Sequence, residues 1–154
     1  MIYWEDLEVG RDEVFGSVEV SRDEVIEFAQ RYDPQPFHLS DEAAAKTHFG
    51  RIAASGWHTC AMAMSVIARH VVKTEQAGLG SPGVDELRWL KPVYPGDTLT
   101  ISGTIIEKTP SRSKPRIGSF RTRTRVTNHD GADVLTFTSI VLMRRRPSEA
   151  AAES

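Results

Sequence analysis

A short segment, residues 33–38, combines a carboxylate and an imidazole, Asp33 and His38, with two prolines, Pro34 and Pro36. Proline fixes its own backbone φ and restricts the preceding residue to extended conformations, so the segment is stiff. A stiff segment can hold a carboxylate and an imidazole in a fixed relation, which acid–base catalysis on a water molecule requires. The alternative is structural: Asp33-Pro34 only ends a helix, and His38 only precedes the next helix cap.

A second candidate is Gly56, which follows Ala54-Ser55 and immediately precedes a long apolar run. If that run is a helix, the backbone amide of Gly56 lies near the positive end of the helix dipole, with no side chain to block access. Such an amide resembles an oxyanion hole, which stabilises negative charge developing on a carbonyl oxygen. The alternative is that Gly56 is only a packing glycine. Together, Asp33, His38 and Gly56 would suit chemistry beside a carbonyl group.

Hydrophobic periodicity predicts the elements that must position these residues. Ser21 and Glu24 have the capping-box spacing that begins a helix, and this helix is expected to end near Tyr32. The run after Gly56 is apolar or small on every side, which is typical of a buried helix. We further expect strands at 12–20, 84–93, 98–105, 117–127 and 134–143, and helices at 40–46 and 57–76, the latter ended by Gly78 and Gly80. These elements predict an α+β fold in which an antiparallel sheet curls around one long helix.

The length and composition limit the class of protein. The 154 residues fit a single domain, expected over 1–146, with a disordered tail over 147–154. The chain carries 19 basic and 21 acidic residues, so it lacks the basic excess of a nucleic-acid-binding domain. Its longest apolar stretch, 61–68, is far shorter than the ~20 residues of a membrane span. The only cysteine, Cys60, is expected to be a small core residue, and a cytoplasmic location fits best.

Three blocks of sequence, taken together, resemble the MaoC-like dehydratases, the family that includes (R)-specific enoyl-CoA hydratases. The blocks are residues 33–38 (DPQPFH), 49–57 (FGRIAASGW) and 87–97 (LRWLKPVYPGD), and the resemblance extends from Trp4 to about Met143. It implies a hotdog fold, in which an antiparallel sheet wraps around one long central helix. It also implies a catalytic pair with the spacing D-x-x-x-x-H, which Asp33 and His38 satisfy.

By this similarity, Asp33 and His38 would activate water for addition to a 2-enoyl-CoA, giving the (R)-3-hydroxyacyl-CoA, or would remove water in reverse. The N–H of Gly56 would bind the thioester oxygen. The resemblance implies neither a metal nor another cofactor, because CoA is part of the substrate. The substrate-binding candidates lie in the same blocks: Gln35, Phe37, Ser55 and Trp57. The chain departs from the family's usual residues at Tyr32, Gln35, Phe37 and Ser55, which bears on the identity of the substrate.

The expected partners are an acyl-CoA thioester and a second copy of the chain. Arg112, Lys114 and Arg116 form a basic loop that is a weak candidate for contact with the CoA phosphates, with a solvated charged surface as the alternative. A homodimer or higher homo-oligomer is expected because the central helix is too apolar for one short sheet to cover. No nucleic acid or membrane is expected as a partner.

Two other functions remain open from the sequence. Hotdog thioesterases commonly use a carboxylate on or near the central helix, whereas the run after Gly56 carries no acid before Glu75. A hotdog subunit that binds an acyl chain without catalysis is the second alternative. The intact Asp33 and His38 pair argues against it, and Gln35 leaves it open.

Overall fold

The computed structural model describes residues 1–147, so the tail expected over 147–154 lies outside the described residues apart from Pro147. Within the described part, five strands form one sheet in the order β1-β3-β4-β5-β2, and every neighbouring pair is antiparallel. The strands are β1 (Asp12–Glu19), β2 (Gly83–Trp89), β3 (Thr98–Pro110), β4 (Ile117–Thr127) and β5 (Asp133–Arg144). The two edges of the sheet are therefore β1 and β2.

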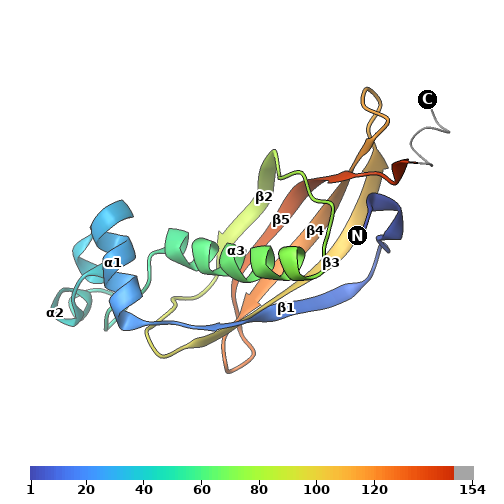
Figure 1. Ribbon diagram of the computed structural model, residues 1–154. Coiled ribbons are helices and arrows are strands. Elements are labelled where there is room, and N and C mark those ends of the chain that lie inside the picture. Colours follow the sequence, from blue (N-terminus) through green and yellow to red (C-terminus); the bar gives the residue numbers. More distant parts are fainter. Residues whose placement is uncertain (148–154) are drawn as a thin grey trace.

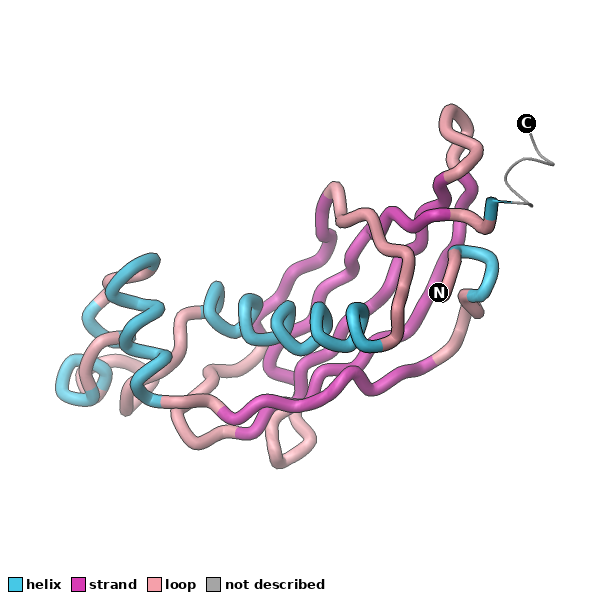
Figure 2. Tube along the Cα trace, in the orientation of Figure 1, coloured by secondary structure: helices cyan, strands magenta, loops and turns pink. Residues whose placement is uncertain are grey.

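One long helix, α3 (Gly56–Lys73), crosses the concave face of this sheet (Figures 1 and 2). Its inward side chains, among them Ala63 and Val66, join a single core with sheet residues of alternating register, namely Leu99, Ile101, Val126, Leu135 and Phe137. Alternate residues of a strand share one face, so each strand supplies every second side chain to this core. The sheet wrapped around a helix confirms the expected α+β architecture.

The helix α3 differs from its expectation in length. It ends at Lys73, not Gln76, because the Thr74 hydroxyl donates to the carbonyl of His70 at 2.7 Å and Glu75 then turns left-handed at φ 52°. Gly78 and Gly80 do not end it. Within a single chain α3 is not buried on every side, which agrees with the expectation that one short sheet does not cover it. Trp57, Met64 and Val72 are exposed, so one apolar face of α3 is left uncovered by the sheet.

The segment between β1 and α3 folds into short helices beyond one end of the sheet (Figure 1). The helix α1 (Arg22–Tyr32) begins as expected, with the Ser21 hydroxyl accepting from the Glu24 amide. A 3-10 turn, η2 (Pro36–His38), and α2 (Asp41–Ala44) follow. The helix α2 is shorter than the expected 40–46, because the amides of Lys46 and Thr47 bond carbonyls three residues back, as in a tight turn.

The opposite end of the sheet is closed by the two ends of the described chain. A 3-10 turn, η1 (Trp4–Asp6), lies against β4. The buried Arg145 forms a 2.9 Å ion pair with Glu5, and the Trp4 indole donates to the carbonyl of Ser119 at 2.9 Å. None of the helices in this described part is long and apolar enough to cross a membrane.

Candidate active site

Asp33 ends α1 and is held by hydrogen bonds to both oxygens of its carboxylate. Its backbone leaves the helix at φ −154° and ψ 67°, as expected for a residue that precedes proline. The Oδ1 atom accepts a hydrogen bond from the side-chain amide of Gln35 at 2.6 Å, and Oδ2 accepts one from the Ser55 hydroxyl at 2.7 Å. The carboxylate is therefore fixed between its own loop and the start of α3.

His38 is the last residue of η2 and is only 5% exposed. Its Nδ1 lies 2.7 Å from the carbonyl oxygen of Ala53. A carbonyl can only accept a hydrogen bond, so we assign the ring proton to Nδ1, which leaves Nε2 as an acceptor in the neutral ring. That Nε2 faces Oδ2 of Asp33 at 3.4 Å. The backbone thus fixes the imidazole so that its free nitrogen points at the carboxylate.

The surroundings of Asp33 favour its charged form. Burial raises the pKa of its carboxyl, but the hydrogen bonds from Gln35 and Ser55 outweigh burial and lower the pKa below its ordinary value of 3.8, and a positive charge on His38, when the ring is protonated, acts in the same direction. Asp33 is therefore a carboxylate at neutral pH. An ionised Asp33 Oδ2 and an unprotonated His38 Nε2 are both acceptors, so a single water molecule can donate one hydrogen to each. Such a water can lose a proton to this pair.

Ser55 and Gly56 bring the start of α3 to the same place. Ser55 is fully buried and occupies the N-cap position, but its hydroxyl is committed to Asp33 and makes no cap hydrogen bond. The N–H of Gly56, at the first helical position, has no carbonyl inside the helix to bond. An added Cβ at residue 56 would lie 2.6 Å from the Trp89 ring, so only glycine fits without displacement. The structure therefore unites Asp33, His38, Ser55 and Gly56.

The substrate-binding candidates divide into those that hold the pair and those that surround it. Gln35 and Ser55 are hydrogen-bond donors to Asp33. The Phe37 ring stands edge-on to His38, with centroids 4.6 Å apart, and so supports the imidazole. Trp57 is 58% exposed and packs edge-on against Trp89, with centroids 5.0 Å apart. Trp57 therefore presents an exposed ring next to Gly56 in the sequence.

The basic loop does not join this site within one chain. Arg112, Lys114 and Arg116 are exposed in the loop between β3 and β4. Figure 1 shows this loop near the C-terminal end of the described chain, whereas α1 and α2 lie at the other end of the molecule. Contact between this loop and a CoA bound beside Asp33 of the same chain has no support in the geometry.

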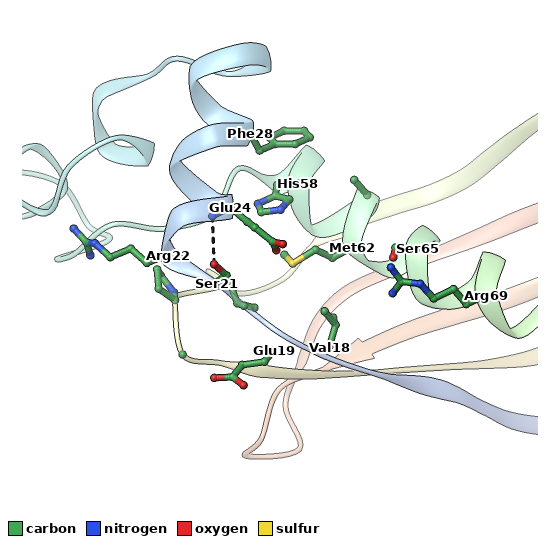
Figure 3. A pocket seen from close by; sticks show the side chains of 14 residues that line it. Val18, Glu19, Ser21, Arg22, Glu24, Phe28, His58, Met62, Ser65 and Arg69 are labelled. Atoms are coloured by element: carbon green, nitrogen blue, oxygen red, sulfur yellow. Dashed lines mark hydrogen bonds between the residues drawn. The ribbon is translucent and has the colours of Figure 1, made fainter.

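A cavity of about 970 Å³ lies between α1, α3 and the end of β1 (Figure 3). His58 lines it, with its ring stacked on Phe28 at a centroid distance of 4.7 Å. Burial lowers the pKa of His58, against the opposing charge of Glu24, so its ring is neutral at pH 7. Its Nδ1 has no hydrogen-bond partner within residues 1–147. His58 belongs to no sequence motif that would predict a role at this cavity.

Two partners of the site also had no signal of their own in the sequence. The carbonyl of Ala53, which fixes the His38 ring, is a backbone group that any residue would supply. Trp89 donates its indole N–H to the carbonyl of Gly56 at 2.8 Å, across 33 residues of sequence. Trp89 lies in the block of residues 87–97, but only its contact with Gly56 in the folded chain reveals its role.

Comparison with known proteins finds relatives in sequence and in fold. A curated 3-hydroxybutyryl-CoA dehydratase from Methylorubrum extorquens is 33% identical over 119 residues, which cover 76% of this chain and 72% of that protein. The crystal structure of a MaoC-like dehydratase from Rhodospirillum rubrum is 37% identical, covers 96% of this chain and 99% of that one, and superposes with a TM-score of 0.85. An (R)-hydratase from Pseudomonas aeruginosa is 26% identical, covers 94% and 87%, and has a TM-score of 0.74.

The family itself follows from a match along most of the chain. The model of the MaoC-like domain matches residues 8–129, which include Asp33, His38, Gly56 and Trp89. The sheet wrapped around α3 is the hotdog fold of these solved relatives, as the resemblance implied. This chain belongs to the MaoC-like domain family.

Proposed function

We propose that this protein is a hydratase or dehydratase acting on the double bond of an enoyl thioester. The observation that carries the proposal is the pairing of Asp33 and His38, with Nε2 and Oδ2 3.4 Å apart, beside the uncapped first amide of α3. The names of relatives add support, because a 3-hydroxybutyryl-CoA dehydratase and an (R)-hydratase are among them. The substrate is a 2-enoyl-CoA and the product is the (R)-3-hydroxyacyl-CoA, or the reverse.

In the proposed hydration, Asp33 and His38 take a proton from the water while its oxygen bonds to C3 of the enoyl group. The C2–C3 double bond shifts its electrons toward the thioester carbonyl, whose oxygen gains negative charge. The N–H of Gly56 donates to that oxygen, where preorganised donors contribute most. The proton held by the pair then goes to C2, which completes the addition of one water. Dehydration follows the same steps in reverse.

A thioesterase is the second candidate function, and the composition of the central helix argues against it. From Gly56 to Lys73, α3 contains no aspartate or glutamate, so it offers no carboxylate for hydrolysis in the manner common among hotdog thioesterases. Glu75 lies beyond the end of the helix, in the left-handed turn. A non-catalytic acyl-binding subunit is less well supported, since such a protein would not need Nε2 of His38 and Oδ2 of Asp33 to face a common water.

The deciding experiment is a panel of trans-2-enoyl-CoA thioesters that differ in acyl length. Loss of the conjugated double bond is followed by ultraviolet absorbance, and free thiol is measured in parallel. A hydratase removes the double bond without releasing thiol, and chelator leaves the rate unchanged. Thiol release would favour the thioesterase, and binding without turnover would favour the acyl-binding subunit. Chiral analysis of the product tests its configuration, and an (S) product would contradict that part.

We also propose that the protein is at least a homodimer. Trp57, Met64 and Val72 leave an apolar face of α3 exposed, and β2 is a free edge of the sheet. A second copy would cover this face, and joining sheet edges across a two-fold axis would remove an exposed strand edge. Light scattering at micromolar concentration should give about twice the chain mass of 17.1 kDa. A mass equal to one chain would contradict the proposal.

A further inference from the structure

Trp89 ends the edge strand β2 and reaches across to the first turn of α3. Its indole N–H donates to the carbonyl of Gly56 at 2.8 Å, and its ring lies against the α-carbon of that glycine closely enough to exclude a Cβ. The chain that follows Trp89 also runs beside the residues that precede Gly56, since the amide of Ala54 donates to the carbonyl of Val93 at 2.8 Å. The second and third family blocks are therefore joined at this point.

An irregularity in β2 decides that this residue faces the helix. The pairing of β2 with β5 shifts between Asp85 and Arg88, where two residues of β2 oppose one of β5. Within this bulge Glu86 has φ 54°, an uncommon conformation for a residue other than glycine. Side chains alternate between the two faces of a strand, so one extra residue exchanges the faces of all that follow.

The consequence of the bulge can be read from the pairing with β5. Trp89 pairs with Leu135, whose side chain belongs to the core on the concave face. Continuing the register of Gly83 to Asp85 without the extra residue would pair Arg88 with Leu135 instead. The bulge therefore directs the indole, and not a guanidinium, toward the start of α3.

Gly56 is consequently held from two directions. On its N-terminal side, the Ser55 hydroxyl is bonded to Asp33. On its C-terminal side, the Gly56 carbonyl is bonded to Trp89. The orientation of the Gly56 N–H depends on both neighbouring peptide groups, so losing either bond frees the amide to tilt away from a developing oxyanion.

We propose that Trp89 is a positioning residue for the Gly56 amide, aimed at it by the bulge at Glu86. The inference rests on the proposed hydratase function, in which this amide binds the thioester oxygen. Trp89 acts through the glycine and donates no hydrogen bond to the reacting atoms. Its contribution therefore belongs to the transition state, where negative charge on the oxygen is largest, and appears in kcat more than in KM.

The test compares Trp89→Phe with a matched control, Trp4→Phe. Both substitutions remove an indole N–H that donates to a backbone carbonyl, at 2.8 and 2.9 Å, but Trp4 lies at the opposite end of the sheet. Trp89→Phe should lower kcat about 3- to 10-fold per folded molecule, with KM changed less than about twofold, as for one neutral hydrogen bond. Trp4→Phe should leave kcat unchanged. Equal kcat values for Trp89→Phe and the wild type would overturn the proposal.

A second variant keeps the test independent of how phenylalanine packs. Replacing Trp89 by benzothienylalanine keeps the shape of the ring and substitutes sulfur for the N–H. The same loss of kcat is expected, and an unchanged kcat with a normal melting temperature would refute the role of the hydrogen bond.

A stability cycle tests the contact without any substrate. Gly56→Ala places a methyl group 2.6 Å from the Trp89 ring, so it should lower the melting temperature strongly in the wild type and much less in Trp89→Ala. Equal losses in the two backgrounds would refute the contact. If the wild type hydrates no thioester of the panel, the proposed function fails on that result alone. The cycle then still decides whether Trp89 holds Gly56.

Discussion

The proposed catalytic pair, His38 and Asp33, lies near the start of α3, and a second pair, His70 and Glu13, lies near its other end. The contrast between the two pairs shows what proximity leaves out. His70, in the last turn of α3, contacts Glu13 of β1 directly, with Nε2 and Oε1 2.9 Å apart. His38 and Asp33 are farther apart, at 3.4 Å. Proximity alone would therefore favour the His70 pair.

The hydrogen-bond partners of the two pairs favour His38 and Asp33 instead. The Glu13 side chain is 36% exposed and its hydrogen bond to His70 joins the two groups to each other. Asp33 is instead fixed by Gln35 and Ser55, and the His38 ring by the carbonyl of Ala53. In the His70 pair, Nε2 of the histidine and Oε1 of Glu13 are hydrogen-bonded to each other. The His38 pair is positioned by third groups, which leaves Nε2 and Oδ2 available to a common water.

The largest expected effect comes from removing either member of the proposed catalytic pair. Asp33→Ala or His38→Ala should lower kcat about 10²- to 10⁴-fold, the range for a positioned proton-transfer group. The double variant should be only slightly worse than the poorer single variant, because both groups act on one water. Turnover and melting temperature are measured for all three. A well-folded His38→Ala with near-normal turnover would instead show that Asp33-Pro34 and His38 have only structural roles.

A smaller loss is expected from Ser55→Ala, which removes a donor to Asp33. A hydrogen bond to a charged group contributes about 1.5–3 kcal/mol, so kcat should fall by about tenfold or more and stability should fall as well. The matched control is Ser111→Ala, whose hydroxyl accepts from the Lys114 amide in the distant loop. The comparison uses kcat and chemical denaturation of both variants. If the two variants had equal kcat, Ser55 would not hold a catalytic carboxylate.

The pH dependence of stability should separate Asp33 from a solvated carboxylate. Its folded pKa is below its unfolded pKa, so its stabilisation is present above about pH 4 and is lost as pH falls through the folded pKa. Each unit of lowering corresponds to about 1.4 kcal/mol. The wild type should therefore lose stability on acidification faster than Asp33→Asn. Urea denaturation at pH 7, 5 and 3.5 measures both, and a gap that stays constant with pH would contradict this prediction.

The smallest effect is expected at the other histidine. His70→Gln should leave kcat within about twofold and change the free energy of unfolding by no more than about 1 kcal/mol, because a partly exposed pair contributes little. Turnover of His70→Gln and Glu13→Gln, beside urea denaturation, checks this. A loss of kcat at either position, comparable with that at His38, would remove the distinction between the two pairs.

The sequence alone determined the features that depend on neighbours along the chain. Asp33 and His38 are five residues apart and are stiffened by Pro34 and Pro36, so their association is local. Strand alternation predicted the sheet, with β4 found at the residues expected for it. The glycine at position 56 and the apolar run after it predicted the start of α3 to within one residue.

Only the tertiary structure decided the features that depend on distant segments. The Ser55 hydroxyl reaches Asp33 across 22 residues, and the Trp89 indole reaches Gly56 across 33. The bulge at Glu86 is hidden in the sequence, because the backbone adopts its left-handed conformation there without a glycine. Which side chains of α3 stay exposed was likewise decided by the tertiary structure, since an apolar run does not tell which of its faces the sheet covers. Local spacing fixes which groups can react, and long-range packing fixes how they are held.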